Sequence, residues 1–431
     1  MKEIFKRLIT DSQERNYNDI VPREYDIPLD TKKIVSLVGV RRCGKTYILF
    51  SLIEKLRQSI DRANIIYINF EDDRLFPIKL KDLDSLLEGY YELYPDKREE
   101  KIYLFLDEVQ NIEGWERYLR RIYDTLNVQL FVTGSSSKLL SSEIATSLRG
   151  RTITYEIFPF SFREYLRYKQ IDINFYSSKS ISYIKNAFDF YLVNGGFAET
   201  FDESADVQKR ILKDYLDLIV YKDIVERYQI KNQSLLKHII KYMFVNMGTL
   251  VSVNKLYNDY KSQGYKIGKD TLQDYLSYLQ EAYALFTVPI YRNSVRQEQR
   301  NPKKLYAIDN GFKKLFSISA SKDYSKLYEN LAFLHLRRKS DEVYYYKQTQ
   351  EVDLYIKTDK EYLVNVAYQI EDEKTFQREI KALEEGMRYF NLTKSYLITS
   401  EREEIVKTES GSIEVIPMWK WLLMDETKES I

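Results

Sequence analysis

The sequence predicts an α/β protein with a doubly wound parallel sheet in its first third, a helical and winged-helix region, and a C-terminal α/β domain. Short β-branched runs alternate with stretches of helical periodicity up to about residue 160, which is typical of a parallel sheet covered by helices. Between the first predicted strand and the first long helix, residues 39–46 read GVRRCGKT. They match the phosphate-loop pattern G-x-x-x-x-G-K-S/T in the context that this motif requires.

The elements and domains follow from the same periodicity. A helix is predicted at 46–59, and strands are predicted at 32–40, 63–70, 101–109, 128–134 and 152–160. From residue 161 the pattern is mainly helical, and helices followed by a strand pair then give a winged-helix rhythm. The predicted domains are a P-loop ATPase core, a helical lid region, a winged-helix-like region and an α/β domain, at residues 1–165, 166–234, 235–300 and 301–431.

Composition narrows the classes of function. Lys plus Arg total 66 and Asp plus Glu total 65, so no overall field attracts nucleic acid. No stretch approaches the roughly 20 apolar residues of a membrane span, and the N-terminal segment has no apolar signal region, so no membrane partner is expected. The single cysteine, Cys43, agrees with a reducing cytoplasm. We therefore expect a cytoplasmic protein.

The phosphate loop assigns a task to each of its characteristic residues. Gly39 and Gly44 allow the backbone to turn its N–H groups toward an anion at the start of a helix. Lys45 is expected to reach the β- and γ-phosphates of ATP, and the Thr46 hydroxyl to bind Mg²⁺. The full set expected to contact the nucleotide is Gly39, Val40, Arg41, Arg42, Cys43, Gly44, Lys45, Thr46 and Tyr47.

Two carboxylates end the strand LFLDEVQ, at residues 104–110. Ligands bind at the carboxyl edge of such sheets, so Asp107 is expected to hold Mg²⁺ through its water shell. Glu108 is expected to orient or deprotonate the attacking water. A strand that ends in Asp-Glu is by itself often only a solvated turn, but its position about 60 residues after a phosphate loop favours this role.

Further catalytic candidates follow the fourth predicted strand. In VTGSSS, residues 132–137, Ser135 or Ser136 could sense the γ-phosphate, although an ordinary polar turn explains the same residues. In SLRGR, Arg149 and Arg151 could stabilise transition-state charge in a neighbouring subunit. A surface ion pair explains these arginines equally well.

Several segments together resemble the AAA-type ATPases widespread in archaea and bacteria, which carry a C-terminal domain of unassigned function. The resemblance covers nearly the whole chain. It implies an ATPase core that uses ATP and Mg²⁺, a winged-helix segment and a C-terminal domain similar to the PD-(D/E)xK nuclease fold. The segments that carry it include VGVRRCGKT, YINFEDDRL, FLDEVQNIEGWERYLRRIYD, YLVNGGFAE, YKDIVERY, KLYAIDNGF and YENLAFLHLRR.

The nuclease-like part departs from the pattern that the fold implies. Such a site needs a helix carboxylate, a strand Asp and an E-x-K that together bind Mg²⁺. Glu329 and Asp353 match the first two positions, but Asn365 and Ala367 fill the slots of Glu and Lys. We expect a degenerate site, retained for binding or assembly, in place of an active nuclease.

Partners beyond ATP and ADP stay open. Lys261, Lys266 and Lys269 could contact DNA phosphates, and a candidate wing at 292–300 carries three arginines, although acidic residues share the third helix. A protein partner and a second copy of the chain are alternatives. The predicted function is Mg²⁺-dependent ATP hydrolysis coupled to movement of the C-terminal domains; the alternatives are a nucleotide-dependent switch with little turnover and a DNA nuclease.

Overall fold

The computed structural model describes residues 1–134, 148, 150–316, 324–370 and 372–424. The chain divides into two compact units, Met1–Phe158 and Pro159–Ile431. Each unit is described by itself. Within the described part of the chain, no helix combines the length and the apolar character needed to cross a bilayer.

The first unit is built on a five-stranded sheet in the order β2-β3-β4-β1-β5, in which all neighbouring strands are parallel. Every residue of β1 and β3 is buried, as expected for a parallel sheet covered on both faces. This confirms the predicted parallel sheet. The strands are β1 (Ile34–Val38), β2 (Ile65–Asn69), β3 (Ile102–Asp107), β4 (Val128–Gly134) and β5 (Thr152–Glu156).

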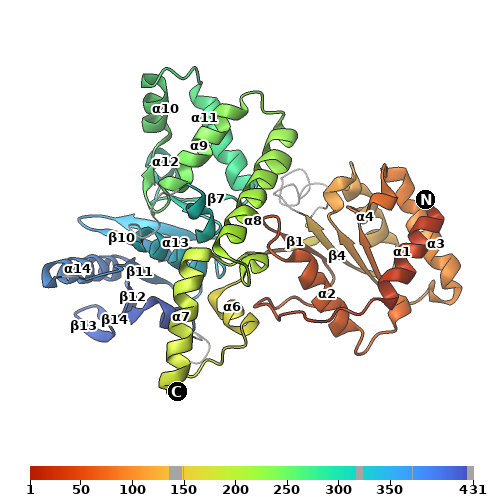
Figure 1. Ribbon diagram of the computed structural model, residues 1–431, viewed down its shortest axis with the longest axis horizontal. Coiled ribbons are helices and arrows are strands. Elements are labelled where there is room, and N and C mark those ends of the chain that lie inside the picture. The colour runs from red at the N-terminus through yellow and green to blue at the C-terminus, as the bar shows by residue number, and fades with distance from the viewer. Residues whose placement is uncertain (135–147, 149, 317–323, 371, 425–431) are drawn as a thin grey trace. The chain divides into compact units, whose positions relative to one another are not determined.

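One helix precedes the first strand and three others lie between successive strands (Figure 1). They are α1 (Lys2–Glu14), α2 (Lys45–Leu56), α3 (Asp84–Leu93) and α4 (Trp115–Thr125). The sequence reasoning missed α1, which packs against α3 and β2. Its buried Phe5, Leu8 and Ile9 follow helical spacing and were the available signal.

The second unit begins with a helical region. It contains α6 (Phe162–Tyr168), α7 (Ser178–Asn194) and α8 (Ala205–Leu218), and α8 continues into a π-helix at Ile219–Glu226. Ser161 starts α6 with a reciprocal capping box to Glu164, so the helix begins where the sequence supplies both partners.

Three helices and a small sheet follow: α9 (Gln233–Val245), α10 (Val253–Ser262) and α11 (Lys269–Glu281), with β6 (Leu250–Val251), β7 (Leu285–Val288) and β8 (Lys303–Ala307). The strands are antiparallel in the order β6-β8-β7. Part of the candidate wing forms a short helix, α12 (Val295–Arg300).

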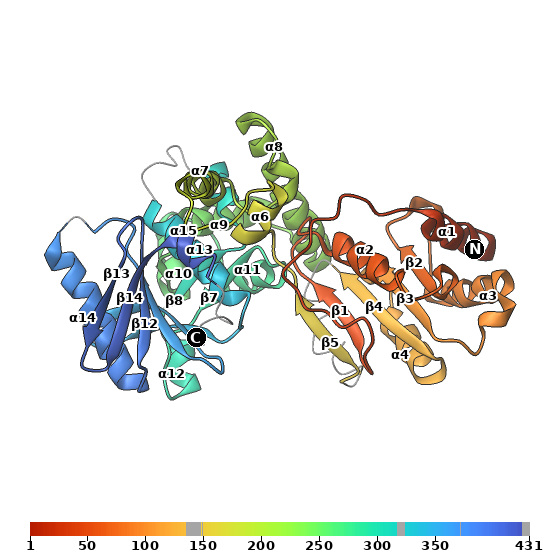
Figure 2. The same ribbon diagram turned by 90° about the horizontal axis from the view of Figure 1, so that it is seen from below.

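The C-terminal part of the chain forms a six-stranded sheet in the order β13-β14-β12-β11-β10-β9. As Figure 2 shows, α14 (Glu373–Phe390) covers one face, and α13 (Tyr324–Arg337) and α15 (Met418–Trp421) lie on the other. The strands are β9 (Val343–Lys347), β10 (Glu351–Ile356), β11 (Tyr362–Val366), β12 (Lys394–Thr399), β13 (Glu404–Thr408) and β14 (Gly411–Pro417).

Candidate functional site

The phosphate loop joins the end of β1 to the start of α2, and its shape depends on glycine at both ends. Gly39 has a φ of 151°, and a Cβ there would lie 2.1 Å from the carbonyl oxygen of Ile157. Gly44 has a φ of 97° and directly precedes α2. Neither conformation suits a residue with a side chain. The sequence therefore forces a turn whose amides precede a helix N-terminus, which is a general anion-binding arrangement.

Lys45 lies folded against this loop. Its side chain is buried, and its Nζ donates to the carbonyl oxygens of Gly39 at 3.1 Å and Val40 at 3.2 Å. An ammonium group is costly to bury without an anion. Among the described residues, these two carbonyl oxygens accept its hydrogen bonds, and the phosphates of a nucleotide would supply negative charge next to the loop amides.

Asp107 is the polar centre of the site. It is fully buried at the end of β3 and accepts hydrogen bonds from three hydroxyls, those of Thr46 at 2.8 Å, Tyr67 at 2.9 Å and Thr133. Burial raises the pKa of its carboxyl, while the hydrogen bond from Thr133 opposes this shift. A buried carboxylate held by neutral donors is well suited to a cation.

The geometry of Thr46 and Asp107 fits Mg²⁺. Their side-chain oxygens are 2.8 Å apart. Adjacent ligands of an octahedral Mg²⁺ with bonds of about 2.1 Å lie about 3 Å apart. The two oxygens could therefore hold the ion directly or through its water shell, and a bound Mg²⁺ would supply charge neutralisation to the phosphates.

Glu108 follows directly and has a left-handed backbone with a φ of 55°. Its N–H donates to the hydroxyl of Thr133 at 3.0 Å, and its carboxylate accepts from Gln110. A non-glycine residue in this region is uncommon and clusters at functional sites. The turn directs Asp107 and Glu108 to one edge of the sheet.

The remaining expected loop residues differ in exposure. Cys43 is buried and Tyr47 is 60% exposed. Arg42 has a left-handed φ of 66°, and Arg41 pairs with Glu71 at 3.4 Å.

The other catalytic candidates are not all placed in this site. Ser135, Ser136 and Arg149 lie outside the described residues. Arg151 directly precedes β5, at the amino edge of the sheet, whereas the phosphate loop lies at the carboxyl edge. It forms a two-pronged ion pair with Asp124, at 3.0 and 3.1 Å. The structure therefore does not bring Arg151 to the phosphate loop of its own chain.

The second unit contains a different acidic cluster. Its carboxylates are Glu329 on α13 and two residues of β10, Glu351 and Asp353, and they surround Lys304 of β8. The Lys304 ammonium lies 3.0 Å from Glu329, 3.1 Å from Glu351 and 2.7 Å from Asp353. Burial lowers the pKa of Lys304, but these charges outweigh it and hold the pKa well above its ordinary value. The cluster therefore contains its own cation.

Asn365 and Ala367 stand where the expected nuclease pattern has Glu and Lys. The Asn365 side chain accepts from the backbone N–H of Asp353 at 3.0 Å and donates to Glu379 on α14 at 2.8 Å. Ala367 offers no polar group. The degenerate nuclease-like site stays a prediction.

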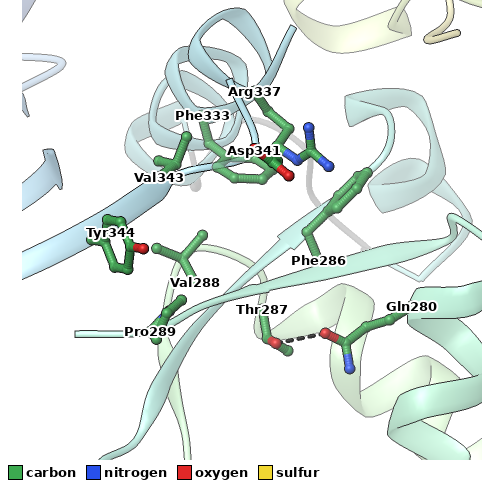
Figure 3. A pocket seen from close by; sticks show the side chains of 10 residues that line it. All are labelled: Gln280, Phe286, Thr287, Val288, Pro289, Phe333, Arg337, Asp341, Val343 and Tyr344. Carbon is green, nitrogen blue, oxygen red and sulfur yellow. Dashed lines mark hydrogen bonds between the residues drawn. The ribbon is translucent and has the colours of Figure 1, made fainter. Parts of the chain in front are cut away.

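A cavity of about 240 Å³ also lies in the second unit (Figure 3). Phe286 and Phe333 meet on one side of it with ring centroids 5.4 Å apart, and the Arg337 guanidinium lies 5.8 Å from the Phe286 ring. None of the residues predicted for function lines it. The lining residues are Gln280, Phe286, Thr287, Val288, Pro289, Phe333, Arg337, Asp341, Val343 and Tyr344.

Comparison with known proteins identifies the family. An uncharacterized protein of Methanocaldococcus jannaschii is 36% identical over 437 residues, covering 98% of this chain and 96% of the relative. Residues 31–166 match the AAA domain family. The chain belongs to the AAA-type P-loop ATPases. Residues 185–321 of this AAA-type ATPase match a domain of unknown function (DUF8612). An uncharacterized protein of Haemophilus influenzae is 30% identical, covering 91% of this chain and 95% of the relative.

Two solved structures are also similar to this AAA-type ATPase. A Walker-type ATPase of Pyrococcus abyssi aligns with a TM-score of 0.40 and 15% identity, covering 73% of this chain and 95% of that one. The Aeropyrum pernix ORC1 protein in complex with DNA aligns with a TM-score of 0.31 and 15% identity, covering 67% of this chain and 87% of that one.

Sequence reasoning missed two residues that shape these sites in the AAA-type ATPase. Arg23 donates to the carbonyl of Cys43 at 3.0 Å and to that of Phe158 at 2.7 Å, which ties the phosphate loop to the segment after β5. Lys304 fills the acidic cluster. Arg23 lies in no recognisable motif, and Lys304 begins the segment KLYAIDNGF, in which nothing connects it with the acidic residues.

Proposed function

We propose that this AAA-type ATPase binds ATP with Mg²⁺ and hydrolyses it to ADP and phosphate. The observation that carries the proposal is the pairing of Thr46 with the buried Asp107 directly beside Lys45 and the loop amides. In the proposed reaction Lys45 and the loop amides bind the phosphates, and Thr46 and Asp107 hold the metal. Glu108 accepts a proton from the attacking water.

The test separates binding from turnover. Glu108→Gln should leave ATP binding within about twofold and lower kcat by at least about 100-fold, because general-base catalysis contributes roughly that much. Binding is measured with a fluorescent ATP analogue, and turnover by phosphate release. Glu113→Gln, in the same segment beyond the strand, is the control. Equal turnover by the Glu108→Gln and parent proteins would remove Glu108 from this role.

We also propose that ATP occupancy changes how the second unit engages a partner, with DNA as the first candidate. The order of α9, α10 and α11 with the β6-β8-β7 sheet resembles a winged helix, and Lys261, Lys266 and Lys269 belong to it. Acidic Asp270 and Asp274 are exposed nearby and weaken the electrostatic attraction. Fluorescence anisotropy with duplex DNA, with and without a non-hydrolysable ATP analogue, tests this; a triple Lys→Ala protein that binds DNA as the parent does would contradict it.

A second copy of the chain is the other proposed partner. Arg151 lies at the far edge of the sheet from its own phosphate loop, so any catalytic role for Arg151 requires a neighbouring subunit. Light scattering with and without the ATP analogue measures assembly. Loss of turnover in Arg151→Ala, restored by mixing with a Lys45→Ala protein, would support a role in trans.

A nuclease is not proposed. The position that a metal would need among Glu329, Glu351 and Asp353 is filled by the Lys304 ammonium.

A further inference from the structure

A third carboxylate lies at the edge of the sheet where Asp107 and Glu108 emerge. Asn69, the last residue of β2, pairs in register with Asp107, and the next residue donates its N–H to the Asp107 carbonyl oxygen at 3.0 Å. Glu71 follows at the start of the turn. Its own N–H donates to the Asn69 side chain at 2.9 Å, which fixes the turn and the direction in which Glu71 leaves it.

Glu71 is in contact with the phosphate loop. Its Oε1 lies 3.4 Å from Nη1 of Arg41, which occupies the third position of the loop. The Glu71 side chain is 51% exposed and that of Arg41 is 18% exposed. A half-solvated ion pair of this length contributes little to stability. Its consequence is geometric, because it helps to set the orientation of the Arg41 guanidinium in the loop.

Glu71 is also close enough to Glu108 for their charges to interact. Partial burial raises the pKa of Glu71, the charge of Glu108 raises it further, and Arg41 opposes both. Arg41 therefore offsets part of the repulsion that Glu71 experiences from Glu108. The three side chains come from three separate segments: the phosphate loop, the turn after β2 and the turn after β3.

We propose that Glu71 is a positioning residue of the nucleotide site, whose ion pair with Arg41 holds the guanidinium of the phosphate loop at the edge of the sheet where β2 and β3 end. This inference rests on the proposed ATP hydrolysis. Negative charge accumulates on the phosphates during phosphoryl transfer, and a guanidinium of the phosphate loop that is already fixed in position stabilises that charge without reorganisation.

Two opposite effects distinguish this role from a purely structural one. Without nucleotide, Glu71 competes with phosphate for Arg41, so its removal should strengthen ATP binding. During turnover, Glu71 restrains Arg41, so its removal should slow catalysis. A residue that only stabilised the loop would weaken both when removed.

The experiment compares Glu71→Gln, Glu71→Asp and, as control, Asp73→Asn, which removes an exposed carboxylate from the same turn. We measure the Kd of a fluorescent ATP analogue in EDTA, and KM and kcat with Mg²⁺, on the full chain. Glu71→Gln should bind about threefold tighter, as expected for losing a weak competing ion pair. Its kcat should fall about tenfold through misplacement of Arg41. Glu71→Asp should restore part of kcat, and Asp73→Asn should match the parent.

A second measurement links the effect to Arg41. In an Arg41→Gln background, Glu71→Gln should no longer change Kd, because the cation for which Glu71 and phosphate compete is gone. Weaker binding together with lower kcat in Glu71→Gln, or values equal to those of Asp73→Asn, would overturn the positioning role while leaving ATP hydrolysis intact. A parent protein that neither binds nor hydrolyses ATP would overturn the proposed function, and this inference with it.

Discussion

The two acidic clusters of this protein use the same chemical groups in opposite ways. In the first unit, Asp107 is buried among three hydroxyls, and among the described residues it forms no ion pair. In the second unit, Glu329 and Asp353 are packed around Lys304, which the chain itself supplies. The proposed function assigns the first carboxylate to a cation from outside the chain, whereas the second group uses the Lys304 ammonium to join secondary-structure elements. The residues that surround a carboxylate, more than the carboxylate itself, decide its role.

The largest expected effect is on ATP binding at the site that contains the first cluster. Lys45→Ala should weaken ATP binding by at least about 100-fold, because a buried ammonium next to phosphates contributes more than a surface ion pair. Isothermal titration calorimetry measures the loss. Lys55→Ala, in the last turn of the same helix, is the matched control. Unchanged affinity in Lys45→Ala would remove the loop from nucleotide binding.

The next prediction concerns the contribution of Lys304, the cation of the second cluster, to the free energy of unfolding. Lys304→Met should lower the free energy of unfolding by about 3–5 kcal/mol, because it leaves buried carboxylates without their counter-ion. Lys347→Met removes a lysine that is half exposed and lies 3.5 Å from Glu351, and should cost less than about 1 kcal/mol. Denaturant unfolding measures both. A small loss in Lys304→Met would show that Glu329 and Asp353 are accommodated without the ammonium.

A third test concerns Asp309, a buried carboxyl that supports neither cluster. It accepts from the backbone N–H of Gly196 at 2.6 Å and of Gly311 at 2.8 Å. Burial raises its pKa from 3.8 to about 6, while these hydrogen bonds and the charges of Arg338 and Lys314 oppose the shift. The folded state therefore binds more protons than the unfolded state between these values.

The sign of the pH dependence follows from this difference. The contribution of Asp309 to stability is fully present below about pH 3.8 and is lost as pH rises through 6, by up to about 3 kcal/mol. Unfolding in denaturant between about pH 3.5 and 7 should show this loss, and Asp309→Asn should remove it. If the free energy of unfolding changed with pH equally in the parent and the variant, Asp309 would not be the cause of this pH dependence.

Local motifs explain what the sequence could predict. The phosphate loop and the Asp107–Glu108 pair were found because each is a short pattern next to one strand. Glu329 and Asp353 were also found, but not Lys304, because it lies 25 and 49 residues away from them and is recognised only once β8 packs against α13 and β10. Arg23 escaped for the same reason, since it supports a loop 20 residues away through a backbone carbonyl.

The smallest expected effect is on the stability of the nucleotide-free protein when Asp107 is replaced. It tests whether the two clusters differ as described above. If this carboxylate is kept for a cation and not for stability, Asp107→Asn should stabilise the nucleotide-free protein by about 1 kcal/mol, because it removes a buried charge. The three hydroxyls can rotate to donate to the oxygen of the substituted side chain or to accept from its amide group. In the second cluster, by contrast, Glu329→Gln should destabilise the protein, because Lys304 loses a charged partner.

Thermal unfolding without nucleotide and Mg²⁺ measures the Asp107 effect as a rise in Tm of about 2–4 °C. Adding ATP and Mg²⁺ should raise the Tm of the parent but not that of Asp107→Asn, since the variant lacks the metal-binding oxygen charge. Asp124→Asn, which breaks the surface pair with Arg151, should leave both values near those of the parent. A lower Tm for nucleotide-free Asp107→Asn would show that the three hydroxyls alone are enough to stabilise the ionised carboxylate. The two clusters would then differ in whether a ligand can reach them, and not in whether their carboxylates destabilise the protein.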